Sequence, residues 1–428
     1  MKVLWLCNIM LPAYAIAHDL DYSVREGWLT GCLNRIISQK EPDFQLGICF
    51  PASGEITTSS EVIQGVTYYG FNEDLDHPEK YDGTIENRFH AILDDFNPDV
   101  VHIFGAEFPH SLAMLRAFGN PEKALLGIQG ICSEIAKAYM AGIPEEVQNT
   151  ATFRDRLKED SLIQQREKYL ARAEHEREAI MLTGNITGRT DFDREKTNEI
   201  NPEANYYFMN ETMRPCFYKG KWEEKNVVPH SIFLSQGDYP LKGFHFVLEA
   251  MPKLLERYPD AHLYVAGNNI IGKGKSKYPY FVRASAYGKY IKKLISKNKL
   301  KKRVTMLGSL SDEEMKQQFL ESSVFVCPSV VENSPNSVGE AMLLGVPTVA
   351  ARVGGIPTLI TENKDGLLFE SGNVDEMVNA ISSIWDEPVI SAVISDNARQ
   401  HARKTHDADA NYNRLVEIYR EINKRSKA

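Results

Sequence analysis

The chain has 428 residues, of which 43% are apolar and 25% are charged, a balance typical of globular domains and not of disordered or fibrous proteins. The length fits two domains of about 200 residues each. No run of 18 apolar residues occurs, so we expect no transmembrane helix. The apolar start at residues 3–7 passes directly into Asn8 and a turn at Pro12, which predicts a buried strand and not a signal peptide. We therefore expect a cytoplasmic protein, either free or peripheral at the inner face of the membrane.

Charge is unevenly distributed along the chain, although its formal total is −9. Residues 1–218 carry 20 basic and 34 acidic side chains, whereas residues 219–428 carry 29 and 24. The second half is therefore better suited to an anionic ligand than the first. The overall negative charge argues against nucleic acid as a partner. Six scattered cysteines without a C-x-x-C pair predict reduced thiols.

Apolar runs typical of buried strands alternate with helical patterns in both halves, which predicts an α/β protein with parallel sheets. The expected strands cover residues 3–7, 44–49, 62–69, 100–104, 124–128 and 184–190 in the first half, and 231–235, 262–266, 305–307, 324–327 and 348–350 in the second. Residues 149–180 are rich in charge with interleaved apolar positions, and they predict one or two long solvated helices on the first domain. The polar stretch at 219–228 marks the expected domain boundary.

The block at residues 324–369 carries the most specific chemistry of the chain. After its opening strand, Ser334 fits the N-cap of a helix and Pro335 fits the first helical position. A helix N-terminus directs backbone N–H groups and a partial positive charge at a phosphate. Glu332 and Glu340 flank this N-terminus and can accept hydrogen bonds from sugar hydroxyls. A phosphate site between two hydroxyl acceptors is what a nucleotide-sugar requires.

This block resembles the glutamate–seven–glutamate signature of retaining GT-B glycosyltransferases, in particular family 4 (glycosyl transferases group 1). The features that agree in order are the Glu332–Glu340 pair, the E-A-M-x-x-G-x-P tail, the loop Gly354-Gly355-Ile356-Pro357 and the segment Asp365-Gly366-Leu367-Leu368. The resemblance implies that Glu340 binds the ribose hydroxyls and that Glu332 contacts the donor sugar. It also implies that the amides of Asn336, Ser337 and Val338 hold the diphosphate.

The same resemblance implies an architecture of two Rossmann-like, doubly wound domains that face each other across a cleft. Residues 1–218 are the expected N-terminal, acceptor-side domain, and residues 219–405 are the expected nucleotide-sugar-binding domain. Residues 406–428 are expected to form a C-terminal helix that crosses back to the first domain, with its pattern strongest from about 408 to 425.

Two further loops of the second half resemble the donor site of this family. In the loop after the strand at 231–235, Lys242 is expected to place a positive charge on the donor phosphates beside Gly243. Many relatives carry an arginine where this chain has the neutral Gln236, which bears on how strongly the leaving group is neutralised. The backbone of the turn that contains Gly308 and Leu310 is expected at the nucleobase.

The first half carries a weaker resemblance on its acceptor side. Gly27 lies where the family has a glycine-rich loop, and His102 and Glu107 follow the pattern of a strand that ends near the acceptor. Gln129 replaces a histidine that contacts the donor sugar in many relatives, and glutamine takes no proton, so we assign it no base role. Two interpretations stay open: His102 is a ligand contact or a core histidine, and Arg189 faces the cleft or belongs to a structural ion pair.

Residues 273–303 hold twelve Lys or Arg and no Asp or Glu, interleaved with aromatic residues. This basic run predicts either a solvated loop and helix or a surface that docks on anionic membrane lipid near a lipid-linked acceptor. Four Asp-x-Asp triplets occur, a number that an acidic chain gives by chance, and no His/Cys cluster has zinc spacing. We therefore expect no metal and no cofactor, with a UDP-, GDP- or ADP-sugar as substrate.

The sequence thus predicts a metal-independent, retaining glycosyltransferase of the hexosyltransferase type. It would move a sugar from a nucleotide-diphosphate sugar to a hydroxyl of a glycan or lipid-linked acceptor, in cell-envelope, capsule or exopolysaccharide synthesis. Lys242 and Glu332 are the expected catalytic residues. Two alternatives remain, namely a nucleotide-sugar epimerase on the same fold and a non-catalytic partner that binds nucleotide-sugar, the latter suggested by Gln236 and Gln129.

Overall fold

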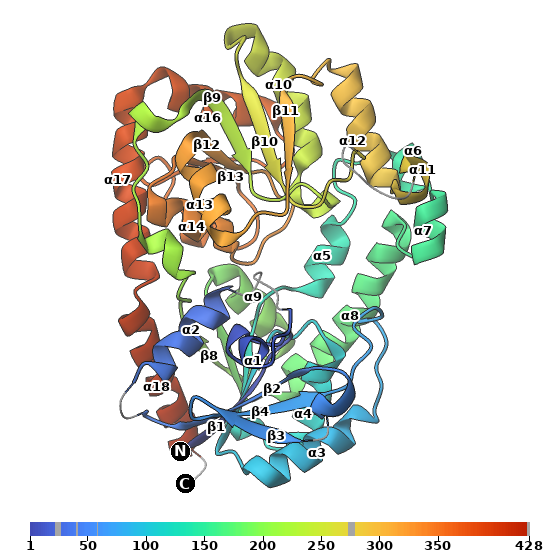
Figure 1. The fold of residues 1–428 in the computed structure, drawn as a ribbon, viewed down its shortest axis with the longest axis vertical. Coiled ribbons are helices and arrows are strands. Elements are labelled where there is room, and N and C mark those ends of the chain that lie inside the picture. The colour runs from blue at the N-terminus through green and yellow to red at the C-terminus, as the bar shows by residue number, and fades with distance from the viewer. Residues whose placement is uncertain (22–26, 40–41, 58, 273–278, 426–428) are drawn as a thin grey trace. The chain divides into compact units, whose positions relative to one another are not determined.

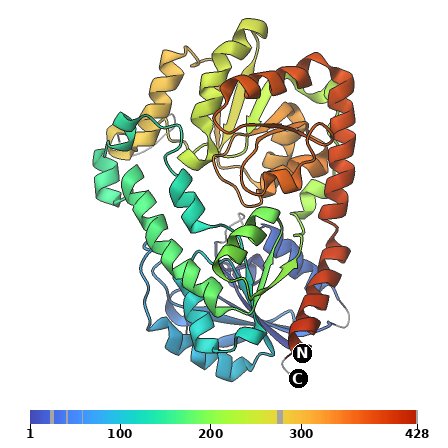
Figure 2. The ribbon, with the colours of Figure 1, turned by 180° about the vertical axis from the view of Figure 1, so that it is seen from behind.

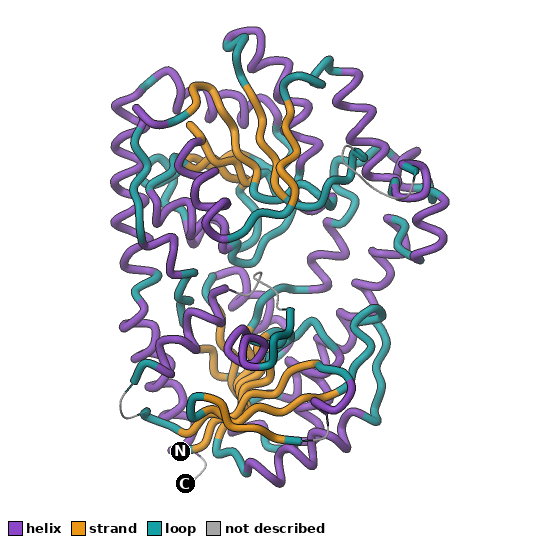
Figure 3. The backbone as a smooth tube through the Cα atoms, in the orientation of Figure 1, coloured by secondary structure: helices purple, strands orange, loops and turns teal. Residues whose placement is uncertain are grey.

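The computed structural model describes residues 1–21, 27–39, 42–57, 59–272 and 279–425. This part of the chain contains two β-sheets, each flanked by helices, which appear as two groups of orange strands in Figure 3. Parallel strands joined through helices make both sheets doubly wound. The predicted α/β class with two Rossmann-like domains is therefore confirmed.

The first sheet has eight strands in the order β3-β4-β2-β1-β5-β6-β7-β8, of which only the β3–β4 pair is antiparallel among the pairs described. Its strands are β1 (Lys2–Leu6), β2 (Gln45–Pro51), β3 (Ser60–Ile63), β4 (Val66–Phe71), β5 (Val100–Phe104), β6 (Ala124–Gly127), β7 (Asn185–Gly188) and β8 (Asn205–Phe208). The single strand predicted at 62–69 is wrong. Gln64 and Gly65 have positive φ angles of 52° and 79°, which close a two-residue turn and make a hairpin of β3 and β4.

Among the described residues, the second sheet has six parallel strands in the order β11-β10-β9-β12-β13-β14. They are β9 (Val228–Leu234), β10 (His262–Ala266), β11 (Val304–Gly308), β12 (Ser322–Cys327), β13 (Thr348–Ala351) and β14 (Leu367–Phe369). The strand order reverses beside β1 in the first sheet and beside β9 in the second. In open α/β sheets, ligands bind at the carboxyl ends of the strands near such a reversal.

Helices connect the strands, and some of them lie side by side on the sheets, such as α10 and α12 in Figures 1 and 2. The helices named below are α2 (Gly27–Ile37), α4 (Pro109–Phe118), α5 (Cys132–Ala138), α6 (Glu145–Gln148), α7 (Phe153–Lys158), α8 (Leu162–Leu182), α9 (Asp191–Ile200), α10 (Phe244–Arg257), α11 (Tyr280–Arg283), α12 (Ala286–Lys297), α14 (Asn336–Leu344) and α18 (Ala408–Arg425). The charged region predicted at 149–180 forms α7 and α8, which are separate because Glu159 has a φ of 51°. None of the described helices is long and apolar enough to span a membrane.

The chain divides into two compact units. Unit 1 consists of Met1–Ser133, Lys168–Arg214 and His406–Ala428, and unit 2 consists of Glu134–Glu167 and Pro215–Thr405. Unit 2 thus includes residues 134–167, which the expected division assigns to the first domain. Polar contacts hold this segment there: the Asp155 carboxylate accepts a hydrogen bond from the Ala286 amide at 2.9 Å, and His245 Nε2 donates to the Ala141 carbonyl at 3.2 Å. The helix pairs α6–α12 and α7–α11 pack beside these bonds.

Helix α18 forms part of the hydrophobic core of unit 1. It packs against α2, and its apolar side chains lie in one cluster with those of β1 and β2. Tyr419 is fully buried there, and its hydroxyl oxygen accepts a hydrogen bond from Trp5 Nε1–H at 2.8 Å. Helix α18 therefore holds the Tyr419 hydroxyl in a fixed, buried position next to β1.

Candidate active site

Backbone hydrogen bonds join the loops that follow the carboxyl ends of the strands in unit 2, here called the carboxyl edge of unit 2. These bonds are Gly237 N–H to Ala266 O (3.1 Å), Gly267 N–H to Gly308 O (3.0 Å), Val330 N–H to Leu241 O (2.9 Å) and Gly355 N–H to Glu332 O (3.0 Å). The predicted donor residues at 236–243, 308–310 and 332–340 therefore come together at one edge of one sheet.

Lys242 and Glu332, ninety residues apart in the chain, form an ion pair at this edge with a Nζ–Oε1 distance of 2.5 Å. Ser329 Oγ donates a second hydrogen bond to the same carboxylate oxygen at 2.7 Å. The two side chains are 21% and 11% exposed, so each keeps a path to solvent. Burial alone opposes the charge of Lys242, but the Glu332 carboxylate outweighs it and raises the pKa of the lysine. The lysine is therefore a permanent cation.

Two glycines allow the loops to approach each other closely at this ion pair. Gly243 has a φ of 66°, and a Cβ there would lie 1.9 Å from the Pro328 carbonyl oxygen. Gly354 has a φ of 49°, and a Cβ there would lie 1.8 Å from the Glu332 carbonyl oxygen. No L-residue with a side chain fits either position without moving the backbone. The G-G-I-P loop thus has a physical role, because it sets the position of the Glu332 backbone.

Helix α14 begins one residue later than predicted. Pro335 has an extended backbone with φ −67° and ψ 117° and occupies the N-cap position, so Ser334 is not the N-cap. Of the three amides expected at the diphosphate, that of Val338 donates to the Pro335 carbonyl at 3.0 Å, which engages it within the first turn. Glu340 lies in the middle of the helix and is 4% exposed, so its carboxylate has little rotational freedom.

The remaining donor-side residues occupy neighbouring positions at the same edge. Gly308 ends β11 with a φ of 82°, and the space where its Cβ would lie has no atom within 4 Å. Leu310 follows it and is half-buried. Gln236 lies beside Gly267, since its Cγ is 3.5 Å from the position of a Cβ there. The Cβ side of Gly308 is therefore open among the described residues.

Three of the predicted acceptor-side residues line one small cavity of unit 1, at the carboxyl ends of β5, β6 and β7. His102 belongs to β5, Gln129 follows β6 and Arg189 follows β7. His102 is fully buried, with Nδ1 2.6 Å from the Tyr419 hydroxyl oxygen, and burial lowers the pKa of its imidazole to about 3. A neutral histidine in this setting is part of the core, and an acceptor contact from it stays a prediction.

Arg189 forms a buried ion pair with Glu211, with a Nη1–Oε2 distance of 2.8 Å and side-chain exposures of 7% and 5%. Gln129 Nε2 donates to the other Glu211 oxygen at 3.0 Å. Burial raises the pKa of Glu211, and the two partners oppose this rise. Sequence reasoning missed Glu211 because it missed β8, the strand that this carboxylate follows. A strand assignment at 205–208 would have placed it beside Arg189.

Gly27 and Glu107 lie elsewhere in unit 1. Gly27 opens α2, and a Cβ there would lie 2.1 Å from Arg214 Cγ, so this side chain limits the size of the residue. Glu107 follows β5 beside Asn8, and burial raises the pKa of its carboxyl group. The Arg172 guanidinium donates to the Glu107 backbone carbonyl at 2.8 Å. The predicted acceptor side therefore divides into the cavity lined by His102, Gln129 and Arg189 and the separate positions of Gly27 and Glu107.

The basic run at 273–303 is only partly described, and residues 273–278 lie outside the described residues. In α12, Tyr287 and Tyr290 are 3% and 7% exposed and belong to the core of unit 2. Lys289, Lys292 and Lys293 on the same helix are exposed. The interleaved aromatic residues described on α12 therefore serve packing, whereas its lysines form a charged outer face.

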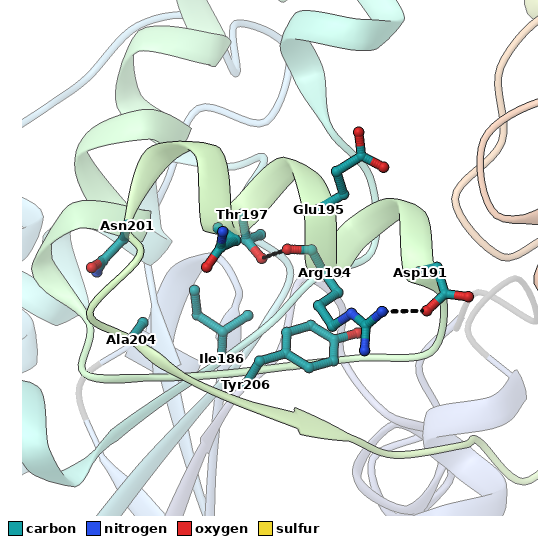
Figure 4. Close-up of a pocket in the computed structure, with 9 residues that line it drawn as sticks. Ile186, Asp191, Arg194, Glu195, Thr197, Asn201, Ala204 and Tyr206 are labelled. Atoms are coloured by element: carbon teal, nitrogen blue, oxygen red, sulfur yellow. Dashed lines mark hydrogen bonds and ion pairs between the residues drawn. The ribbon is translucent and has the colours of Figure 1, made fainter.

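A separate pocket of unit 1 lies between α9 and the strands β7 and β8, and none of its lining residues is a predicted site residue (Figure 4). Its lining includes Asp191, whose carboxylate pairs with Arg194 at 2.9 Å. Asp193, the second acid of this Asp-x-Asp triplet, accepts hydrogen bonds from Thr190 Oγ1 at 2.8 Å and from the Arg189 amide at 3.1 Å. The two carboxylates of this triplet thus cap α9 and pair with its first turn. Over the described ranges, no three His, Cys, Asp or Glu side chains are grouped as metal ligands.

Comparison with known families gives a match on unit 2. Residues 220–401 match the family model described as Glycosyl transferases group 1. The sulfoquinovosyl transferase SQD2 of Arabidopsis thaliana is 37% identical over 100 residues, which cover 23% of this chain and 20% of that protein. The chain therefore aligns with about one fifth of the length of this relative.

Solved structures match over the whole chain at low identity. Sucrose-phosphate synthase of Thermosynechococcus elongatus has a TM-score of 0.70 at 14% identity and covers 99% of both chains. HepE of Anabaena in complex with UDP-glucose has a TM-score of 0.64 at 16% identity and covers 98% of this chain and 100% of its own. The chain thus has the fold of GT-B glycosyltransferases, and its match to the group 1 family falls on the unit that holds Lys242 and Glu332.

Proposed function

We propose that this protein is a retaining hexosyltransferase that transfers a sugar from a nucleotide-diphosphate sugar to a hydroxyl group. The observation that carries the proposal is the solvent-accessible ion pair between Lys242, in the loop that follows β9, and Glu332, in the loop that leads into α14. The family match over residues 220–401 covers both side chains and supports this assignment. The UDP-glucose named for HepE makes UDP-sugars the first donors to test, with GDP- and ADP-sugars next.

Each residue of the pair has a separate role in this proposal. When the donor binds, the Lys242 ammonium contacts the diphosphate, a stronger anion than a single carboxylate. Glu332 then accepts hydrogen bonds from hydroxyls of the donor sugar, and Glu340 accepts them from the ribose. The amides at the start of α14 face the diphosphate with the positive end of the helix dipole.

Retention follows from transfer on the face of the sugar that the diphosphate leaves. The bond between the anomeric carbon and the phosphate oxygen breaks, its electron pair stays on the diphosphate, and the acceptor oxygen bonds to the same carbon. The acceptor proton passes to a phosphate oxygen, so no protein carboxylate needs to act as base or nucleophile. Lys242 and the α14 N-terminus stabilise the charge that develops on the leaving group, and the proposed reaction is metal-independent.

The proposed acceptor is a glycan or a lipid-linked sugar used in cell-envelope, capsule or exopolysaccharide synthesis. The exposed lysines of α12 support a peripheral contact with anionic lipid at the cytoplasmic face of the membrane. The proposed acceptor side lies at the carboxyl ends of the first sheet, where Gly27, Glu107 and Gln129 are the assigned contacts. The buried His102 and Arg189 hold the loops around them in place.

Two experiments test the proposal in sequence. A thermal-shift screen with UDP-, GDP- and ADP-sugars should raise the melting temperature for one nucleotide class, because a ligand that binds the native state stabilises it. NMR of the product made from that donor should show an anomeric carbon of unchanged configuration. Inverted configuration would contradict the front-face route, and no shift with any donor would contradict the function itself.

Assays with the donor found in this screen distinguish the two alternative functions. A new nucleotide-sugar formed without any acceptor would identify an epimerase. Binding with neither transfer nor slow donor hydrolysis would identify a non-catalytic partner.

A further inference from the structure

Two residues with buried polar side chains line the small cavity of unit 1. His102 Nε2 and Thr187 Oγ1 have no hydrogen-bond partner in the described part of the protein, although the two residues are 0% and 3% exposed. Both residues line the same cavity. Buried polar groups without a partner are uncommon in folded proteins, because each loses its hydration without compensation. This pair therefore requires a ligand of its own.

The hydrogen bonds of α18 determine which atom of His102 carries the proton. Tyr419 oxygen accepts from Trp5 Nε1–H, and its own hydrogen points to His102 Nδ1 at 2.6 Å. The opposite arrangement, with the proton on Nδ1, would leave the Tyr419 hydrogen and His102 Nε2 both unsatisfied. Nδ1 is therefore the acceptor, and Nε2–H is a donor directed at the cavity.

A glycine leaves space beside the two residues. Gly127 of β6 pairs in register with Thr187 of β7, and a Cβ at Gly127 would lie 3.4 Å from His102 Nε2 and 3.6 Å from Thr187 Cγ2. The cavity is partly open, and its inner space has room for about one water molecule. Trp28 and Phe104, 5% and 4% exposed, close the apolar side of the cavity.

We propose that this cavity is a binding site for a single neutral water molecule that is a fixed part of the fold. The water oxygen accepts the hydrogen bond from His102 Nε2–H, and the water exchanges a second one with Thr187 Oγ1. Glu211 lies in the same wall and supplies a carboxylate acceptor for the remaining proton. Three hydrogen bonds are the usual number for a buried water.

The site selects a neutral ligand and not an ion. His102 stays uncharged because burial lowers the pKa of its imidazole to about 3. The charge of Arg189 is balanced by Glu211 in the same wall. The bound water completes a hydrogen-bond chain from Trp5 on β1, through Tyr419 and His102, to the wall that holds Gln129.

The experiment compares two threonine-to-valine variants, each in a strand of the first sheet. Thr187→Val keeps the shape of the side chain but removes the hydroxyl that the water binds. Thr67→Val on β4, where the side chain is half-buried, is the matched control. With the water in place, Thr187→Val should lower the melting temperature by about 2–4 °C relative to Thr67→Val, the shift that one lost hydrogen bond gives in a unit of this size. A melting temperature equal to or above that of wild type would overturn the proposal, because removal of an unpaired buried hydroxyl stabilises a protein.

Nitrogen NMR of the intact protein gives an independent reading that needs no variant. The His102 ring should show a proton on Nε2 and none on Nδ1, with magnetisation transfer between the Nε2 proton and water. Gly127→Ala places a methyl group in the cavity and should abolish that transfer while the tautomer is retained. A proton on Nδ1, or a wild-type signal without any transfer to water, would overturn the proposal.

Discussion

The carboxyl edge of each sheet holds an ion pair, and the two pairs differ in how deeply they are buried. In unit 2, Lys242 and Glu332 keep exposures of 21% and 11%, and their pairing joins two loops. In unit 1, Arg189 and Glu211 are 7% and 5% exposed, and Gln129 fixes the carboxylate from a third direction. Lys242 and Glu332 can therefore separate and bind a ligand instead. Arg189 and Glu211 are buried and paired with each other, as in a structural ion pair.

This difference teaches that charge alone does not identify a ligand site in such a fold. A charged residue that binds a ligand must first separate from the side chain with which it pairs when no ligand is bound. Water at a partly exposed pair lowers the free energy of this separation. If the two edges differ in this way, substitutions in unit 1 should mainly lower stability, whereas substitutions in unit 2 should mainly lower turnover.

Removal of Arg189 should mainly affect stability. Arg189→Ala leaves the Glu211 carboxylate buried without its cation, and the loss of one partner from a buried pair costs about 3–5 kcal/mol. Urea unfolding followed by fluorescence measures the change. The double variant Arg189→Met/Glu211→Leu should recover much of the loss, because no buried charge remains. A loss below about 1 kcal/mol for Arg189→Ala, a value usual for surface pairs, would show that the edge of unit 1 is as open as that of unit 2.

Removal of Lys242 should mainly affect turnover. Lys242→Ala should lower kcat by about 10²–10³-fold, the range for loss of one group that stabilises transition-state charge. Lys253→Ala is the matched control, because this lysine pairs with Asp375 on the exterior of the same unit and is 48% exposed. Steady-state kinetics with the selected donor would separate the two variants. Equal kcat values for them would contradict the assignment of Lys242.

Stability should also depend on pH through Glu176 of α8, whose two oxygens accept hydrogen bonds from the Cys132 amide at 3.1 and 2.9 Å. Burial, followed by the nearby Glu107 charge, raises the pKa of Glu176 from 4.5 to about 8. The folded state therefore holds this proton more tightly than the unfolded state, and its stabilising effect is complete below pH 4.5 and is lost as the pH rises to about 8.

Glu176→Gln removes this titration. Melting curves between pH 5 and pH 8.5 should show that the variant gains stability relative to wild type as the pH rises. A constant difference between the two proteins over this interval would show that Glu176 titrates normally. Such a result would show that water reaches the Glu176 carboxyl group in unit 1 in spite of its burial.

The smallest expected effect concerns the exposed lysines of α12. Each of Lys289, Lys292 and Lys293 should contribute about 1 kcal/mol to binding of vesicles that contain acidic lipid, and single Lys→Gln changes should weaken sedimentation accordingly. High salt should have the same effect as the substitutions. Equal partition onto neutral and acidic vesicles at low salt would exclude this contact.

The sequence predicted the edge of unit 2 far better than that of unit 1, and the reason is physical. Residues 322–357 contain β12, a loop, α14 and β13, and their glycines and prolines have strict backbone requirements, so the local pattern determines the geometry. The resemblance also named Lys242, which geometry then placed beside Glu332. The N-cap was misplaced by one residue because Ser334 and Pro335 both suit a helix start, and only the extended backbone of Pro335 decides between them.

The edge of unit 1 depends on contacts between distant segments, which local patterns do not encode. Glu211 meets Arg189 only because β8 pairs with β7, and β8 is a short strand with weak alternation. The tautomer of His102 depends on Tyr419, 317 residues later in the chain. Residues 134–167 look like any charged helical region, and contacts with distant residues assign them to unit 2, such as the hydrogen bond from the Ala286 amide to Asp155.

The central claim is that Glu332 recognises the donor sugar, whereas Lys242 recognises the diphosphate. Calorimetric titration of wild type and Glu332→Gln with the best nucleotide-sugar, and with the same nucleotide diphosphate without sugar, tests it most directly. We predict that Glu332→Gln binds the nucleotide-sugar at least tenfold more weakly, a loss of about 1.4 kcal/mol, and binds the free diphosphate as wild type does. Equal weakening for both ligands, or no weakening for either, would contradict the account.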